Sequence, residues 1–111
     1  MSSSSPGRGS LAPMPPERLE AVVRGRVQGV GFRWFARQEA VRLGLSGWVA
    51  NEPDGSLRCV VEGPKEGLEQ FRDALRAGPP AAIVERVIER WMPATGTLST
   101  FGVRSGAHRG D

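Results

Sequence analysis

The sequence has 111 residues, 39% of them hydrophobic and 24% charged, which is room for one globular domain of ordinary composition. Fifteen Lys and Arg residues against twelve Asp and Glu give a formal net charge of +3, which favours small anions but does not require nucleic acid as a partner. One cysteine, Cys59, and one histidine, His108, argue against a disulfide scaffold, a zinc site of several thiolates and a Ser-His-Asp triad. No apolar run approaches the roughly 18 residues that a membrane-spanning helix needs.

Both ends of the chain are predicted to be disordered tails. Residues 1–16 are mainly Ser, Gly and Pro without hydrophobic periodicity, and residues 105–111 are a Gly-containing polar segment. The domain is therefore expected to span residues 17–104. The apolar stretch at Leu11 is too short for a secretory signal and is broken by Pro13. Together with the single cysteine, this predicts a cytoplasmic protein.

The first half of the expected domain has the pattern of strand, loop, helix and strand. Residues 19–24 alternate between inward apolar and outward side chains, which predicts a strand with one buried face. A loop over residues 25–31 contains three glycines. Apolar residues then recur at helical spacing, and Gly44 is placed to end that helix. The stripe consists of Phe32, Phe35, Ala36, Ala40 and Leu43. Residues 45–51 are expected to form a short strand.

The second half begins with a strong turn signal at residues 52–55 and a returning strand over 56–62. Pro64 suits the start of a second helix, which Gly and Pro end at residues 78–80. The inward side chains are expected to be Leu57, Cys59 and Val61 on the strand and Leu68, Phe71 and Leu75 on the helix. Residues 98–104 are short and apolar enough for an edge strand.

Residues 81–92 are ambiguous. Their apolar side chains fit a helical stripe, which the local pattern slightly favours, but they also fit a strand rich in β-branched residues. If this segment is a strand, the element order is that of an α+β, ferredoxin-like split βαβ sandwich: βαββαβ plus a short C-terminal strand. Two helices would then cover one face of a mainly antiparallel sheet.

The loop from Gly25 to Arg33 has the character of an anion site. Glycines let the backbone curl so that several N–H groups converge, and the helix that follows adds unpaired N–H groups and the positive end of its dipole. Such a place binds phosphate, sulfate or carboxylate. Arg33, in the first helical turn, adds a permanently charged group that can bind two oxygens. The loop is neither a Walker A motif nor a dinucleotide fingerprint, because the residues that those motifs require are missing.

Simpler interpretations exist for each of these residues, and local pattern alone favours them. The loop can be an ordinary tight turn with a solvated Arg33, and Asn51 a turn-forming residue near Pro53. Aromatic residues in the domain are most simply core residues: Phe32, Phe35, Trp48 and Trp91. Val27 and Val30 are expected to contact the core, and Cys59 to be a small buried hydrophobe.

Taken together, the loop sequence Gly-Arg-Val-Gln-Gly-Val-Gly-Phe-Arg at residues 25–33, Gly-Trp-Val-Ala-Asn at 47–51 and Asp-Gly at 54–55 resembles the acylphosphatase family. The resemblance runs from about Leu19 to Arg104. It implies a ferredoxin-like sandwich in which residues 81–92 are a strand. It also implies hydrolysis of a carboxyl–phosphate anhydride to carboxylate and phosphate, without a metal or other cofactor.

The resemblance also assigns roles to residues of this chain. Arg33 matches the phosphate-binding arginine, and Asn51 matches the asparagine that positions the attacking water for in-line attack. Backbone amides of the loop match the phosphate cradle; they are those of Val27, Gln28, Gly29, Val30, Gly31, Phe32 and Arg33. Glu52 stands where animal members often carry threonine, which leaves open what supports the Asn51 side chain here.

Three other functions agree less well with the sequence. An RNA-recognition sandwich would need aromatic residues on its central strands, and neither 19–24 nor 57–62 has one. A module of a larger maturation enzyme agrees poorly with a free-standing chain, and a binding-only domain agrees poorly with the presence of both Arg33 and Asn51. The expected partners are a small acyl phosphate and inorganic phosphate, the latter as product and inhibitor. No nucleic acid or membrane partner is expected, and nothing requires more than a monomer.

Overall fold

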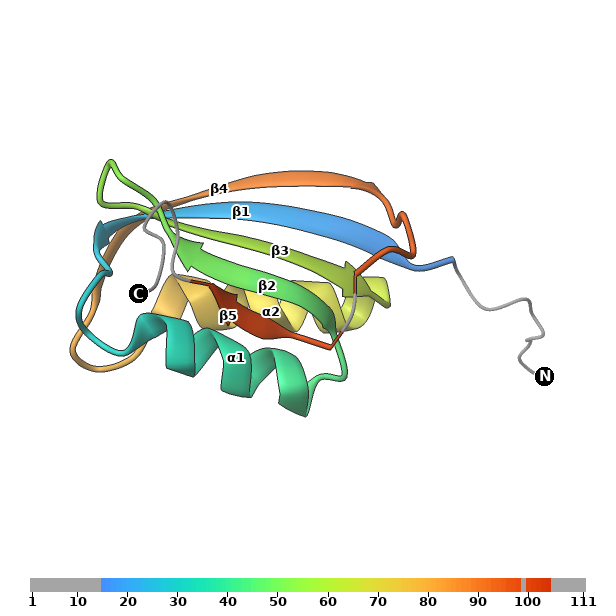
Figure 1. Ribbon diagram of the computed structural model, residues 1–111, viewed down its shortest axis with the longest axis horizontal. Coiled ribbons are helices and arrows are strands. Elements are labelled where there is room, and N and C mark those ends of the chain that lie inside the picture. Colours follow the sequence, from blue (N-terminus) through green and yellow to red (C-terminus); the bar gives the residue numbers. More distant parts are fainter. Residues whose placement is uncertain (1–14, 99, 105–111) are drawn as a thin grey trace, which may run out of the picture.

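The computed structural model describes residues 15–98 and 100–104. These described residues form seven helices and strands (Figure 1). In chain order they are β1 (Glu17–Arg26), α1 (Phe32–Arg42), β2 (Ser46–Asn51), β3 (Leu57–Gly63), α2 (Lys65–Ala77), β4 (Ile83–Pro93) and β5 (Gly102–Arg104). Of the two predicted tails, residues 1–16 lie outside the described part except for Pro15 and Pro16, and residues 105–111, with His108, lie wholly outside it.

The five strands form one mixed sheet in the order β4-β1-β3-β2-β5. Neighbouring strands are antiparallel except for β2 and β5, which pair in parallel. Figure 1 shows α1 and α2 side by side on one face of this sheet, while the other face carries no helix. The predicted α+β, ferredoxin-like fold, βαββαβ plus a short C-terminal strand, is therefore confirmed.

The core lies between the sheet and the two helices. Alternate residues of the central strands β1 and β3 point into it, as the sequence alternation predicts, and each helix contributes one buried stripe at intervals of three or four residues. The buried residues are Leu19, Ala21 and Val23 on β1, Leu57, Cys59 and Val61 on β3, Phe32, Ala36 and Ala40 on α1, and Leu68, Phe71 and Leu75 on α2. Each large aliphatic or aromatic side chain buried here contributes about 1.5–3 kcal/mol of transfer free energy.

The helix ends follow the predicted stop and start signals. After α1, Gly44 adopts a left-handed φ of 71° and its N–H donates to the carbonyl of Val41 at 3.1 Å. Pro64 precedes the first residue of α2 and needs no N–H partner there. Gly78 ends α2, and its N–H donates to the carbonyl of Ala74 at 2.8 Å.

The slight local preference for a helix over residues 81–92 is wrong: the segment forms β4, as the family resemblance implies. β4 pairs with β1 along its length, but the register shifts once, and Glu85 has no partner on β1. This bulge separates the inward-facing Val84 and Val87 by three residues instead of two. Both pack against the core together with Trp91. The interrupted alternation therefore imitates the spacing of a helix.

The helix-free face of the sheet differs from the sequence prediction at two positions. Trp48, expected in the core, lies on this face between two guanidinium groups, with Cζ of Arg58 and of Arg104 at 6.0 and 4.6 Å from its ring centroid. Val60, opposite Trp48 on β3, is fully buried although the alternation of β3 points it away from the helices. Long side chains on neighbouring strands cover the sheet here without a helix.

The predicted edge strand at residues 98–104 is present but shorter. Only Gly102–Arg104 pair with β2, after an isolated bridge between Thr100 and Ser46. Phe101, between the bridge and the strand, is 3% exposed and packs against Phe71 with ring centroids 6.0 Å apart. The segment turns this side chain into the core, which anchors the last strand at the sheet edge.

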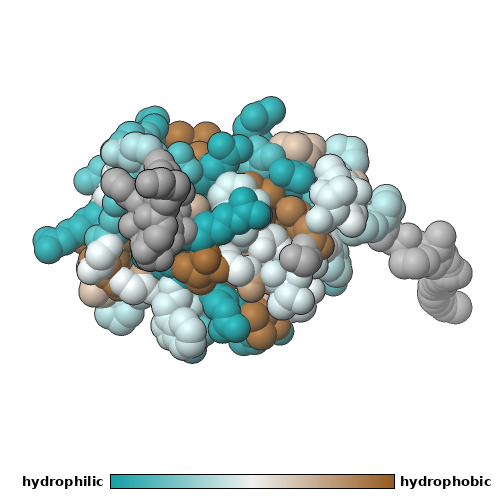
Figure 2. Space-filling model, viewed as in Figure 1, coloured by the Kyte–Doolittle hydropathy of each residue, from teal (hydrophilic) through white to brown (hydrophobic). Residues whose placement is uncertain are grey.

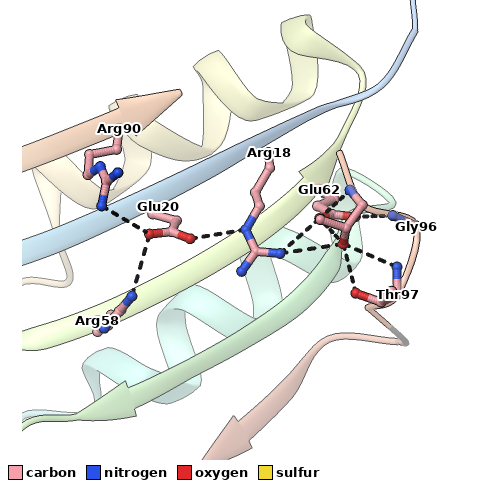
Figure 3. A network of polar contacts seen from close by, with 8 residues as sticks. Arg18, Glu20, Arg58, Glu62, Arg90, Gly96 and Thr97 are labelled. Atoms are coloured by element: carbon pink, nitrogen blue, oxygen red, sulfur yellow. Dashed lines mark hydrogen bonds and ion pairs between the residues drawn. The ribbon is translucent and has the colours of Figure 1, made fainter. Parts of the chain in front are cut away.

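A buried carboxylate fixes the connection that leads to β5. Glu62 on β3 accepts hydrogen bonds from the backbone N–H and hydroxyl of Thr95, each at 2.9 Å, and from the N–H of Gly96 at 3.0 Å (Figure 3). It also forms an ion pair with Arg18 at 3.2 Å. Burial raises the pKa of Glu62, but these hydrogen bonds outweigh burial and leave the pKa below its ordinary value.

None of the helices in the described part of the chain is long and apolar enough to cross a membrane. On the face seen in Figure 2, hydrophobic residues form separate patches among hydrophilic ones. Scattered apolar side chains of this kind are ordinary on a protein surface.

Candidate active site

The loop between β1 and α1 is curled by two glycines. Gly29 and Gly31 have φ values of 73° and 78°, a left-handed conformation that other residues rarely adopt. A Cβ atom at either position would meet nothing within 4 Å, so the backbone conformation, not lack of space, requires glycine there. Within the described part of the chain, the N–H groups of residues 28–31 donate no backbone or side-chain hydrogen bond.

The N-terminus of α1 continues this set of open donors. Gly31 is the N-cap residue, has no side chain to cap the helix, and no acidic residue lies in the first turn. The first N–H groups of a helix have no partner within the helix, and the dipole places partial positive charge beside them. Loop and helix together therefore present several N–H donors and a positive potential to an anion.

These donors open onto a cavity of about 430 Å³ between the loop, α1 and the edge of the sheet. It is lined by Val27, Gly29, Gly31, Phe32, Arg33, Trp34, Arg37, Asn51 and Val103. The structure thus brings Arg33 and Asn51, which are 18 positions apart in the sequence, to one cavity. Of the predicted cradle, Gln28 and Val30 do not line it: the Gln28 side chain turns toward the β2–β3 turn, and Val30 packs against the core.

Arg33 is partly buried, and its guanidinium is held from the far end of the chain. Its Nη1 donates a hydrogen bond of 2.7 Å to the backbone carbonyl of Arg104 in β5. The same Arg104 stacks its own side chain on Trp48 on the opposite face of the sheet. This fixes the position of the carbonyl that holds Arg33. Sequence reasoning missed this partner, since any residue can supply a backbone carbonyl.

Asn51 ends β2 with its side chain on the helix-covered face. It pairs across the sheet with Leu57, whose side chain is in the core. Its Oδ1 is buried and accepts no hydrogen bond from the described residues. A buried polar atom without a partner costs about 1–3 kcal/mol, so this oxygen is suited to accept a hydrogen bond from a molecule in the cavity.

Gln28 joins the glycine loop to the turn that follows Asn51. Its Nε2 donates to the carbonyls of Glu52 at 2.8 Å and Ser56 at 2.9 Å. The Ser56 carbonyl also accepts the N–H of Glu52 at 2.9 Å, which closes the turn. Gln28 was predicted only as a backbone donor. In the sequence, the only sign of the side-chain contact between Gln28 and the turn is that a polar residue stands among the loop glycines.

The turn itself is fixed by Asp54. Its Oδ1 accepts hydrogen bonds from both the hydroxyl and the N–H of Ser56. Hydrogen bonding from Ser56, with a smaller contribution from Arg24, holds the pKa of Asp54 below its ordinary value. The carboxylate therefore stays ionised at neutral pH and keeps the β2–β3 turn closed.

The electrostatic character of the cavity is positive. Its lining residues within the described chain include two arginines and no carboxylate, imidazole or thiol. The described residues contain no group of three or more His, Cys, Asp or Glu side chains placed to hold a metal ion. Cys59 is a free thiol in the core, where burial raises its pKa, in agreement with its interpretation as a small hydrophobe.

Comparison with known proteins places this chain in a family. A sequence model described as acylphosphatase matches residues 19–103. An acylphosphatase of Nocardia farcinica is 46% identical over 89 residues, covering 80% of this chain and 89% of the relative. One of Thermus thermophilus is 55% identical over 74 residues, covering 67% of this chain and 84% of the relative. The crystal structure of acylphosphatase from Bacillus subtilis matches with a TM-score of 0.77 at 34% identity, over 79% of this chain and 98% of that one.

The chain belongs to the acylphosphatase family, a class of hydrolases with a ferredoxin-like fold. Its activity is that of an acylphosphatase, EC 3.6.1.7, and its substrate is accordingly an acyl phosphate.

Proposed function

We propose that this chain hydrolyses small acyl phosphates without a metal, by in-line attack of a water positioned by Asn51 on a phosphate held by Arg33 and the loop amides. The observation that carries the proposal is the shared cavity. Open N–H donors, a guanidinium and an unpartnered buried amide oxygen converge on it from β2, the glycine loop and α1.

Phosphate binding is the task of Arg33 and the backbone. The N–H groups of the loop and of the first turn of α1 suit the non-bridging oxygens, and Arg33 neutralises charge with a geometry that can bind two of them. The hydrogen bond from Arg33 to the Arg104 carbonyl uses one N–H and leaves the rest of the guanidinium for phosphate. Such donors stabilise the charge that builds up on the phosphoryl oxygens in the transition state.

Water positioning is the task of Asn51. Its Oδ1 accepts a hydrogen bond from water, and its amide nitrogen can donate one to a second oxygen. In the reaction, the water oxygen forms a bond to phosphorus while the bond from phosphorus to the bridging oxygen breaks and its electron pair leaves with the carboxylate. A phosphate oxygen takes the proton of the water. The leaving carboxylate is stable, so no acid is needed to protonate it.

The proposal also covers the binding partners of the protein and its location in the cell. Inorganic phosphate is product and competitive inhibitor, and the protein works as a cytoplasmic monomer without a membrane partner. The proposal includes no nucleic-acid partner. On the helix-free face, Arg18, Arg58 and Arg90 all contact Glu20 in one ion-pair network (Figure 3). A free thiol at Cys59 suits a reducing compartment.

The test separates binding from chemistry with two variants and benzoyl phosphate as substrate. Arg33→Gln is expected to abolish both phosphate inhibition and turnover, because amides alone do not neutralise a dianion. Asn51→Ala is expected to lower kcat about a hundredfold or more, the effect of losing about 3 kcal/mol from one polar group at the reacting atoms, while the phosphate inhibition constant changes little.

Arg42→Gln is the matched control, since Arg42 lies on the last turn of α1 and pairs with Glu39 at 2.6 Å. Circular dichroism confirms the fold of each variant. Near wild-type turnover in folded Arg33→Gln would overturn the phosphate site. Parallel loss of rate and phosphate affinity in Asn51→Ala would make Asn51 a binding residue and remove its proposed role with water.

A further inference from the structure

A second arginine lines the cavity and has no part in the proposed reaction. Arg37 follows Arg33 by four residues on α1, so the two side chains leave the same side of the helix. Both line the cavity. Arg37 is partly buried, and its Cζ lies 5.6 Å from the ring centroid of Trp34, in the range of a cation–π contact. Its guanidinium is therefore held at the cavity wall.

Arg37 carries a positive charge that no carboxylate of the described chain pairs with. Like charges four residues apart destabilise a helix by about 0.2–0.5 kcal/mol, so this pair is not favoured for the sake of the helix. The acidic residue of α1, Glu39, pairs with Arg42, and no salt bridge of Arg37 is found within the described chain. A phosphate dianion at the loop receives one formal positive charge from Arg33, together with hydrogen bonds from the open amides and the partial positive charge of the helix N-terminus. The guanidinium of Arg37 stays available to a second anionic group.

The spacing of the two arginines indicates the geometry of a matching ligand. Four residues along a helix correspond to an axial rise of about 6 Å. A ligand that satisfies both groups carries its acyl phosphate at the loop and a second anionic group about one helical turn away. The P–O and O–C bonds of the anhydride, together with two or three carbon–carbon bonds beyond the acyl carbon, span that distance.

Part of the cavity wall is apolar. Trp34 is 58% exposed and Val103 of β5 is 44% exposed, and both line the cavity. Exposed side chains of this size are suited to contact the carbon chain of a ligand. The cavity therefore offers a phosphate cradle at the loop, an apolar surface and a second cation.

We propose that Arg37, supported by Trp34, forms a subsite for a second anionic group, and that the preferred substrates are acyl phosphates whose acyl part ends in a carboxylate or phosphate. This inference rests on the proposed function, because it places the acyl phosphate at Arg33. The chemistry common to these substrates is a mixed anhydride at one end of a short chain and a permanent negative charge at the other.

Two ligand pairs test the subsite, one by binding and one by turnover. For binding, calorimetry compares 5-phosphonopentanoate with pentylphosphonate, which differ by the terminal carboxylate. For turnover, kcat/KM is compared for succinyl phosphate and butyryl phosphate, which have chains of equal length. A third comparison, 5-phosphonopentanoate with 1,4-butanediphosphonate, distinguishes a carboxylate from a phosphate-like group as the second anion.

We expect the wild-type protein to prefer the doubly anionic member of each pair about five- to tenfold, the effect of one charge-assisted contact that stays partly exposed to solvent. Arg37→Gln is expected to bring that ratio to about one, whereas Arg42→Gln keeps it. The preference should also shrink as ionic strength rises, since a partly exposed pair is screened by salt.

A wild-type ratio near one in both pairs, or a ratio that survives in Arg37→Gln, would overturn the subsite. Hydrolysis of benzoyl phosphate separates this failure from failure of the proposed function. If benzoyl phosphate is hydrolysed and Arg33→Gln abolishes that activity, a missing preference refutes only the second-anion subsite. If Arg33→Gln remains active, the proposed phosphate site fails and the subsite fails with it.

Discussion

Gln28 connects the glycine loop with the turn next to Asn51, and its removal gives a sharp prediction. Gln28→Met keeps the length of the side chain but removes both hydrogen bonds, to the Glu52 and Ser56 carbonyls. Two neutral hydrogen bonds contribute about 1–3 kcal/mol together. For a domain of this size that loss lowers Tm by roughly 4–8 °C per kcal/mol.

The same substitution is expected to lower kcat by about tenfold or more. Asn51 directly precedes Glu52, so releasing the Glu52 carbonyl frees the backbone beside the side chain that we propose to position the water. Misplacement of a reacting group by about 1 Å can cost about a hundredfold in rate. The phosphate inhibition constant should change less than kcat, because Arg33 and the loop amides remain.

The assay is a double-mutant cycle with Asn51→Ala, in which kcat and the phosphate inhibition constant are measured for all four proteins. If Gln28 acts through Asn51, Gln28→Met has little further effect on kcat once Asn51 has been removed. Two results would refute this reasoning. One is a loss of stability with unchanged kcat, and the other is a pair of effects on kcat that simply multiply.

Two further predictions concern the ionised groups and metals. Glu62→Gln should lower the free energy of unfolding by about 1–3 kcal/mol at pH 7. The pKa of Glu62 is lowered in the folded state, so the carboxylate stabilises the fold above its ordinary pKa of about 4.3, and this stabilisation is lost as pH falls through the folded value. In urea titrations, the difference in unfolding free energy between wild type and Glu62→Gln should therefore be smaller at pH 3 than at pH 7. An equal difference at both pH values would contradict this. Turnover of benzoyl phosphate should survive exhaustive treatment with EDTA, because no carboxylate that could bind a divalent cation lines the described cavity. A loss of activity that magnesium restores would contradict a metal-independent reaction.

Sequence reasoning succeeded where the determining interactions are local. The stripes of α1 and α2 and the alternation of β1 depend on spacings of two to four residues, and the structure confirms them. It failed at β4, where the bulge at Glu85 depends on pairing with a strand some 60 residues earlier in the chain. It also misplaced Trp48, because the sequence does not indicate that a sheet face without helices can be covered by arginine side chains.

The sequence indicated which side chains form the candidate site, but not the hydrogen bonds that hold those side chains in place. The family resemblance indicates Arg33 and Asn51, and the structure places both at one cavity. The Arg104 carbonyl could not be foreseen, because backbone groups carry no sequence signal. The sequence does not mark Arg37 as a site residue, because an arginine on a helix surface is most simply a solvated residue. The packing of β5 against α1 shows that it lines the cavity.

The hydrogen bond from Arg33 to the Arg104 carbonyl links residues that are 71 positions apart in the chain. At synthesis rates of roughly 5–20 residues per second, Arg104 is added about 4–14 s after Arg33. A nascent chain on the ribosome can form β1, α1 and the glycine loop long before β5 exists. The guanidinium of Arg33 therefore lacks this support until the last strand has emerged and paired with β2. Such long-range pairing is a slow step in folding. The proposed phosphate site thus gains this support only after most of the core has formed.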